Sequence, residues 1–123
     1  MTVPTDSSVD PVIARVLALY AAGSDVDRAD ERAAIKASLA VLSAKAPGHS
    51  VEVRIPPYAA VQVIEGIRHR RGTPPAVVEC DARTWLQVAS GQLEWSVAYA
   101  DGRLRASGER SDLSAILPIH PLN

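Results

Sequence analysis

Two stretches within the first 46 residues carry apolar side chains every three or four positions, the spacing of one buried helical face. The first begins at Asp10-Pro11, where an aspartate can cap a helix and a proline fits its first turn, and it ends at Gly23. The second covers about residues 28–46 and is rich in alanine, the residue with the highest helix propensity. The pattern therefore predicts two helices, with Asp27 as the cap of the second.

After the second helix the apolar period shortens to two, which is typical of strands with one buried face. Residues 51–55 alternate in this way. Residues 58–65 follow after Pro56-Pro57, a pair that cannot donate hydrogen bonds to a sheet. A third short apolar run covers residues 76–80. Three strands are therefore expected in the middle of the chain.

The C-terminal part returns to helical spacing and ends with one more strand and one more helix. Helices are predicted at 82–90, begun by Asp81, and at 94–100. A strand at 103–107 and a short helix at 111–117 follow. The resulting order is ααβββααβα. This order indicates an α+β fold in which helices cover one face of a mainly antiparallel sheet of four to five strands.

Length and composition indicate one domain with an aliphatic core. The 123-residue chain has the size of a single domain, which we expect at 10–123 after a flexible tail at 1–9. Apolar residues make up 47% of the sequence, yet there is no phenylalanine and there are only two tryptophans. Any internal cavity would therefore have mostly aliphatic walls.

Charge and segment patterns argue against several classes of function. The net charge of -1 disfavours capture of nucleic acid or of an anionic membrane. The sequence shows no secretory leader and no apolar run of about 18 residues, the length needed to span a bilayer. The single cysteine is consistent with a reducing compartment. We therefore expect a cytoplasmic protein without a transmembrane segment and with at most transient membrane contact.

No group of residues in the sequence is typical of an active site. Cys80 precedes a helix cap, a position that can lower the pKa of a thiol, but a lone cysteine there is more often a small buried apolar residue. His49, His69 and His120 fall in predicted loops or in the tail, without partners at metal-ligand spacing. Nucleophile-elbow, phosphate-loop and dinucleotide motifs are missing. We expect a protein that is not an enzyme and that needs no metal or cofactor.

The densest charge in the chain is the basic group Arg68, Arg70 and Arg71, which also contains His69. Two interpretations remain open. The arginines could hold a phosphate or carboxylate head group at the mouth of a pocket, or touch a membrane surface. Alternatively, they form a solvated loop that keeps the edge of the sheet from pairing with another chain.

Residues 81–108 combine several features in a defined order. An aspartate opens a helix that ends in a glycine, an alanine follows seven residues later, and then come a glycine, a basic residue, a strand and a closing glycine. The positions after the aspartate are Gly91, Ala98, Gly102, Arg103, Leu104 and Gly108. In this order the segment resembles the sterol carrier protein-2 family. The stretches 56–62 and 71–75 resemble a bacterial, chiefly actinobacterial, branch of that family.

The resemblance implies the fold of that family and a non-enzymatic role in carrying lipids. It implies an apolar pocket between sheet and helices for a sterol, a fatty acid or another acyl chain. The residues that would line this pocket are Val61, Val63, Trp85, Leu86, Trp95, Leu104, Leu113 and Leu117. The same residues could instead fill a close-packed core. In that case the fold would be a protein-interaction module, with the helix at 12–20 as its docking face.

The two tryptophans allow the same pair of interpretations. A buried indole N–H needs a hydrogen-bond partner, so Trp85 and Trp95 could lie at the rim of a pocket. We favour the other interpretation, in which each anchors a helix to the sheet.

Overall fold

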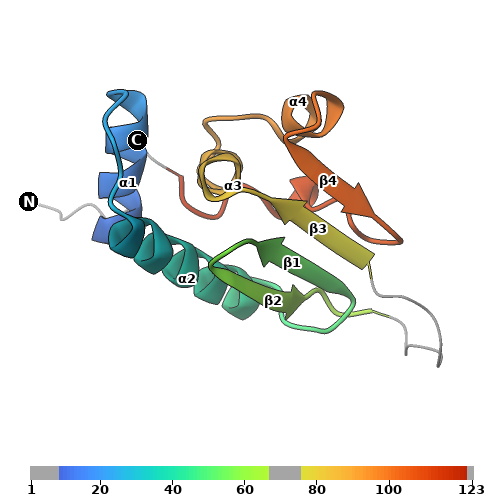
Figure 1. Ribbon diagram of the computed structural model, residues 1–123. Coiled ribbons are helices and arrows are strands. Elements are labelled where there is room, and N and C mark those ends of the chain that lie inside the picture. The colour runs from blue at the N-terminus through green and yellow to red at the C-terminus, as the bar shows by residue number, and fades with distance from the viewer. Residues whose placement is uncertain (1–8, 67–75, 122–123) are drawn as a thin grey trace, which may run out of the picture.

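The computed structural model describes residues 9–66 and 76–121, and these form one layer of helices on one sheet (Figure 1). The element order agrees with the sequence-based order, except that the last element is a short 3₁₀ helix, η2. The elements are α1 (Pro11–Ala21), α2 (Arg28–Lys45), β1 (Val51–Ile55), β2 (Ala59–Val63), β3 (Ala76–Cys80), α3 (Ala82–Ala89), α4 (Trp95–Ala100), β4 (Leu104–Ser107) and η2 (Ser114–Ile116).

The sheet has the strand order β2-β1-β3-β4. The two outer pairings are antiparallel, with Val53 opposite Val61 and Val78 opposite Ala106. The central pairing of β1 with β3 is parallel and places Val53 opposite Val78. The α+β class and the predominance of antiparallel pairs are therefore confirmed. The central parallel pair makes the sheet a mixed one.

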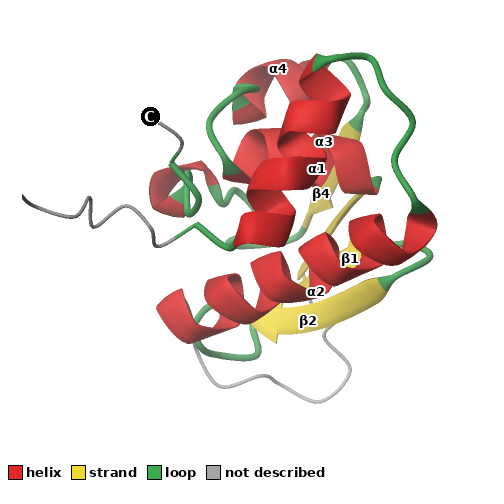
Figure 2. Cartoon of the chain, turned by 90° about the vertical axis from the view of Figure 1, so that its left-hand side faces the viewer, coloured by secondary structure: helices red, strands yellow, loops and turns green. Residues whose placement is uncertain are grey.

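The helices cover one face of this sheet. Figure 2 shows α2 running along β2, with α1 and α3 lying above it. Val51, Val53 and Ile55 of β1 point to this side and are fully buried. The opposite face of the sheet carries ion pairs in which Glu79 contacts Arg54 at 3.8 Å and Arg105 at 3.0 Å. Alternation along each strand thus separates an aliphatic core from a charged outer surface.

Helix α1 is part of the core and does not offer a free docking face. Its apolar residues Ile13, Val16 and Leu17 are buried, and α1 contacts both α2 and α3. The expectation that the helix at 12–20 presents an apolar surface to a partner protein is therefore wrong. The apolar pattern of α1 shows that one face of this helix is buried, but it does not show that α2 and α3 of the same chain cover this face.

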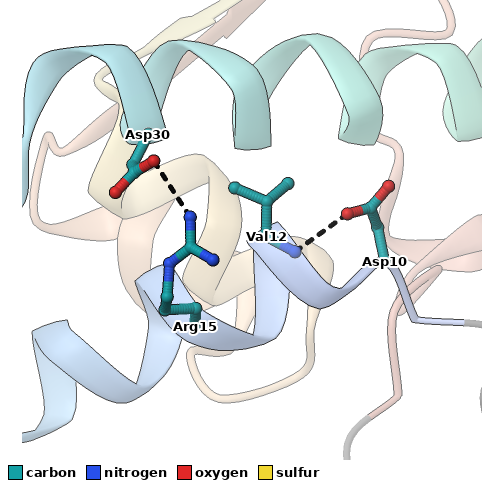
Figure 3. A network of polar contacts seen from close by, with 4 residues as sticks. All are labelled: Asp10, Val12, Arg15 and Asp30. Carbon is teal, nitrogen blue, oxygen red and sulfur yellow. Dashed lines mark hydrogen bonds and ion pairs between the residues drawn. The ribbon is translucent and has the colours of Figure 1, made fainter.

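Two polar contacts hold the ends of α1 and α2 in place (Figure 3). Asp10 Oδ1 accepts a hydrogen bond of 2.9 Å from the backbone N–H of Val12, which confirms the predicted cap. Arg15 in α1 donates to Asp30 in α2 at 2.9 Å. Asp27 occupies the predicted cap position of α2, but its side chain makes no capping hydrogen bond.

The C-terminal segment packs back onto the helices. The backbone N–H groups of Ile119 and His120 both donate to the carbonyl of Ala89 at the end of α3, at 2.8 and 3.0 Å. His120 lies outside helices and strands, as expected, but its side chain is packed into the interior and is only 1% exposed. The helix expected at 111–117 is reduced to the three residues of η2 because the chain turns here to reach α3. Within the described ranges, no helix combines the length and the apolar character needed to cross a membrane.

Candidate functional site

The predicted pocket residues fall into two groups. Five of the eight are 0–1% exposed and belong to the packed core, namely Val63, Trp85, Leu86, Leu104 and Leu113. The other three are half-buried and pack at the margin of this core, namely Val61, Trp95 and Leu117. Only residues of the second group have side-chain surface that a ligand could contact without displacing core side chains.

Trp85 acts as an anchor between two helices. Its indole N–H donates a 2.8 Å hydrogen bond to Ser38 Oγ of α2, and the side chain is fully buried. A tryptophan held in this way stabilises the contact of α3 with α2 through both its ring and its polar atom. Trp95, in contrast, lies at the surface end of α4 and is only half-buried.

A cavity of about 300 Å³ opens beside Trp95. Three segments surround it: the end of α3 with the following turn, the start of α4, and the region around η2. Its lining residues are Val88, Gly91, Leu93, Glu94, Trp95, Ser96, Asp112, Ser114, Leu117 and Pro118. The cavity therefore brings together Trp95 and Leu117 from the predicted set, with Val88 and Leu93 as further apolar walls.

A second cavity of about 350 Å³ lies next to the first, between α4 and β4. Figure 1 shows α4 beside β4 at one edge of the sheet. This cavity is lined by Trp95, Ser96, Tyr99, Ala106, Ser111 and Asp112. Trp95, Ser96 and Asp112 border both cavities, so the two hollows adjoin each other, and together we call them the Trp95 groove.

The lining of the Trp95 groove is mixed: apolar side chains alternate with acidic side chains and hydroxyl groups. Glu94 and Asp112 contribute carboxylates, and the hydroxyl groups come from Ser96, Tyr99, Ser111 and Ser114. Asp112 Oδ1 accepts a 2.9 Å hydrogen bond from the backbone N–H of Ser114. Hydrogen bonds from the side chain and backbone of Ser114 hold the pKa of Asp112 below its usual value, so this carboxylate is charged at neutral pH.

A third cavity, of about 410 Å³, lies where β3 ends and β4 begins. Its two arginines are paired, Arg105 with Glu79 at 3.0 Å and Arg103 with Asp101 at 2.7 Å, and the carboxylate of Asp81 accepts from the backbone N–H of Thr84. Cys80 lines it as well, but burial of the thiol raises its pKa to about 12, with smaller contributions from Asp81 and Glu79. A thiol of this kind is a poor nucleophile.

The sequence-predicted basic group, Arg68, Arg70 and Arg71, lies outside the described residues, so its role at a pocket entrance stays a prediction. Among the residues that the structure describes, no group of His, Cys, Asp and Glu side chains is arranged to hold a metal ion.

Two polar clusters were not foreseen from the sequence. In the first, Ser38 Oγ contacts both Trp85 and Nε2 of His120, the latter at 2.7 Å. The burial of Ser38 could have been predicted from the sequence, because Ser38 lies on the same face of α2 as Ile35 and Leu42. Nothing in the sequence near His120 indicated its burial.

In the second cluster, Glu31 accepts hydrogen bonds from two phenols, Tyr20 at 2.5 Å and Tyr58 at 2.7 Å. These bonds join α1, α2 and the turn between β1 and β2. Burial and the Glu31 carboxylate raise the pKa of Tyr20 above its usual value. The cluster explains why a tyrosine follows Pro56-Pro57: it attaches this turn to α2.

Comparison with protein families gives one match. Residues 27–119, well over half of the chain, match the family model described as "Bacterial SCP ortholog". The matched range begins just before α2 and ends within the C-terminal segment, so it includes every element that borders the Trp95 groove. No curated protein is similar enough to count as a match.

Proposed function

The chain belongs to the family of bacterial SCP orthologs, the sterol carrier type of protein, and we propose that it binds a lipid-like molecule in the Trp95 groove without chemically changing it. The observation that carries this proposal is the groove itself, a hollow on a fold of the carrier type whose mixed lining includes the half-buried apolar side chains Leu93, Trp95 and Leu117. Its two parts, about 300 and 350 Å³, are each at the lower end of the size range for small-molecule sites.

The binding force would be desolvation of an apolar chain. Leu93, Trp95 and Leu117 are half-buried. A ligand that covers them therefore removes apolar surface of these side chains, and apolar surface of its own, from contact with water. Each Å² covered contributes about 25 cal/mol. Trp95 supplies the largest flat surface, and it borders both parts of the groove. A hydrocarbon tail could therefore lie along it from one cavity into the other.

The position of the groove supports a division of the predicted pocket residues into two roles. Trp95 and Leu117 contact the ligand in this proposal, whereas Trp85, Leu86 and Leu104 support the groove from the core. A ligand deep between sheet and helices would have to separate fully buried side chains. Close-packed interiors resist such separation. We therefore place the ligand at the margin of the core.

The two tryptophans provide the test. We would titrate the protein with a long-chain alcohol and a long-chain acid, each brominated in the tail, because bromine quenches only an indole that it touches. Either ligand should quench Trp95 saturably, and unbrominated ligand should reverse the quenching. The Trp95→Phe variant retains only Trp85, which is 0% exposed and bonded to Ser38, so it should show no quenching.

A pair of leucine and valine variants controls for non-specific adsorption. Leu93→Gln places a polar group in the groove and should weaken binding several-fold. Val41→Gln changes an exposed apolar residue on α2 that does not line the groove, and it should leave affinity unchanged. If neither brominated ligand quenches either tryptophan in the wild-type protein, the carrier function is refuted.

A further inference from the structure

The Trp95 groove has an unusual polar rim for a lipid site. Every charged residue that lines either of its cavities is acidic, namely Glu94 and Asp112. The remaining polar groups of the lining side chains are the hydroxyls of Ser96, Tyr99, Ser111 and Ser114 and the indole N–H of Trp95. Within the part of the chain that the structure describes, no arginine or lysine forms an ion pair with either carboxylate.

Asp112 is the central group of this rim. It borders both cavities, and Ser114 keeps it in place through the 2.9 Å hydrogen bond to Oδ1. A carboxylate offers about four lone-pair directions, so Asp112 can still accept hydrogen bonds from a ligand. It cannot donate any, because Ser114 lowers its pKa and keeps it ionised.

Resting on the proposed function, we infer that this rim favours lipids whose polar end is an uncharged hydrogen-bond donor, such as a hydroxyl group, over lipids that end in a carboxylate or phosphate. Asp112 is the specificity-determining residue, and Glu94 reinforces it. A hydroxyl donates to a carboxylate in a charge-assisted hydrogen bond. An anionic head group at the same place would be repelled by Asp112 and, in the first cavity, by Glu94. Both carboxylates are exposed, so water and salt screen this repulsion and each contact costs on the order of 1 kcal/mol.

The test compares two ligands that share one tail and differ only in the head group, a long-chain alcohol and the matching fatty acid. Dissociation constants are measured at neutral pH and low salt, below the concentration at which either ligand aggregates. We expect the alcohol to bind about tenfold more tightly than the acid. This ratio corresponds to the repulsion between two like charges that water partly screens.

Removal of the charge should abolish this preference. Asp112→Asn keeps an oxygen that can accept from Ser114, and Glu94→Gln keeps the length of the side chain. In the double variant the affinity for the acid should rise about tenfold, while the affinity for the alcohol changes by less than about threefold. Asp25→Asn makes the same change of charge at an exposed residue of the α1–α2 loop, and it should leave the ratio as in the wild type.

The outcomes separate this inference from the proposed function. If both ligands bind equally well, or if the acid binds more tightly, the selectivity is overturned although the carrier function stands. If the preference for the alcohol persists in the double variant, Asp112 and Glu94 are not its cause and the inference is overturned. If neither ligand binds, the proposed function fails, and the inference fails with it.

Discussion

Ser38 Oγ lies 2.7 Å from Nε2 of His120, a residue 82 positions later in the sequence. Ser38 also accepts a hydrogen bond from the indole N–H of Trp85, which can only donate. Accepting from Trp85 leaves the proton of the serine hydroxyl available, so Ser38 can donate it to Nε2 of a neutral His120. The three side chains join α2, α3 and the C-terminal segment in the interior, and each buried polar atom in these two bonds has a partner.

Removal of the Ser38 hydroxyl should destabilise the fold, although this group is only one atom and its proton. Ser38→Ala leaves the indole N–H of Trp85 and Nε2 of His120 buried without this partner. The free energy of unfolding should fall by about 1–3 kcal/mol for the groups left unsatisfied. Urea denaturation followed by circular dichroism measures this change. Ser24→Ala, in the exposed loop after α1, is the matched control and should have little effect; equal stability of both variants would contradict the importance of the cluster.

Acid should weaken the fold through His120. Burial lowers the pKa of His120 from 6.5 to about 4, with Lys45 acting in the same direction and Asp10 against it. Because the folded pKa is depressed, the unfolded chain binds the proton first. Stability is therefore full above about pH 6.5, falls as the pH decreases towards 4, and loses at most about 3 kcal/mol from this group.

Variants of two histidines isolate this effect between pH 7.5 and 5, roughly the interval in which histidine alone titrates. His120→Gln can still accept from Ser38 but does not titrate, so its unfolding free energy should change much less with pH. His49→Gln alters an exposed histidine and should retain the wild-type slope. The same slope in all three proteins would show that His120 does not cause the acid sensitivity.

Gly48 should tolerate no side chain. Its φ is +146°, and an added Cβ would lie 2.1 Å from the carbonyl oxygen of Ile64. Gly48→Ala should cost about 3 kcal/mol or more, because two backbone segments must separate. Gly102→Ala is a matched control: its φ is +84° but its Cβ would meet no atom within 4 Å, so about 1 kcal/mol is expected. Similar melting temperatures for both variants would contradict the predicted clash.

Cys80 should resist thiol reagents in the folded protein. It is buried, and its pKa of about 12 leaves almost no thiolate at pH 8. Labelling with Ellman's reagent should therefore be slow and should become complete only on unfolding. A Ser24→Cys variant adds an exposed thiol to the same chain and should react at once with one equivalent of reagent. Rapid labelling of Cys80 in the native wild type would reopen the question of a reactive cysteine.

The sequence predicted the local elements well where neighbouring residues determine them. Periodicity located the strands, and Asp10 and Asp81 cap helices through the hydrogen bonds to Val12 and Thr84. The prediction for β2 was too long, since the strand ends at Val63. Ile64 adopts a positive φ of 71° and bonds to the carbonyl of Ala46 instead. That turn away from the sheet depends on the end of α2, which the strand pattern does not contain.

The groove was predicted only in part. Trp95 and Leu117 were selected as apolar residues for the pocket that the family resemblance implies, and the same reasoning selected Trp85 and Leu104. The structure separates these residues by exposure. Asp112 was interpreted as the start of a helix, and its place on the rim of both cavities follows only from the fold.

What the sequence determined by itself was the order of helices and strands, the class of the fold and the aliphatic character of the core. These properties depend on residues a few positions apart, through helical and strand periods and through caps. The tertiary structure decided the central parallel pairing, the pairing of Ser38 with His120 and the acidic rim of the Trp95 groove. These depend on how side-chain volumes from distant segments fill space together, and a cavity forms only where such packing leaves a gap.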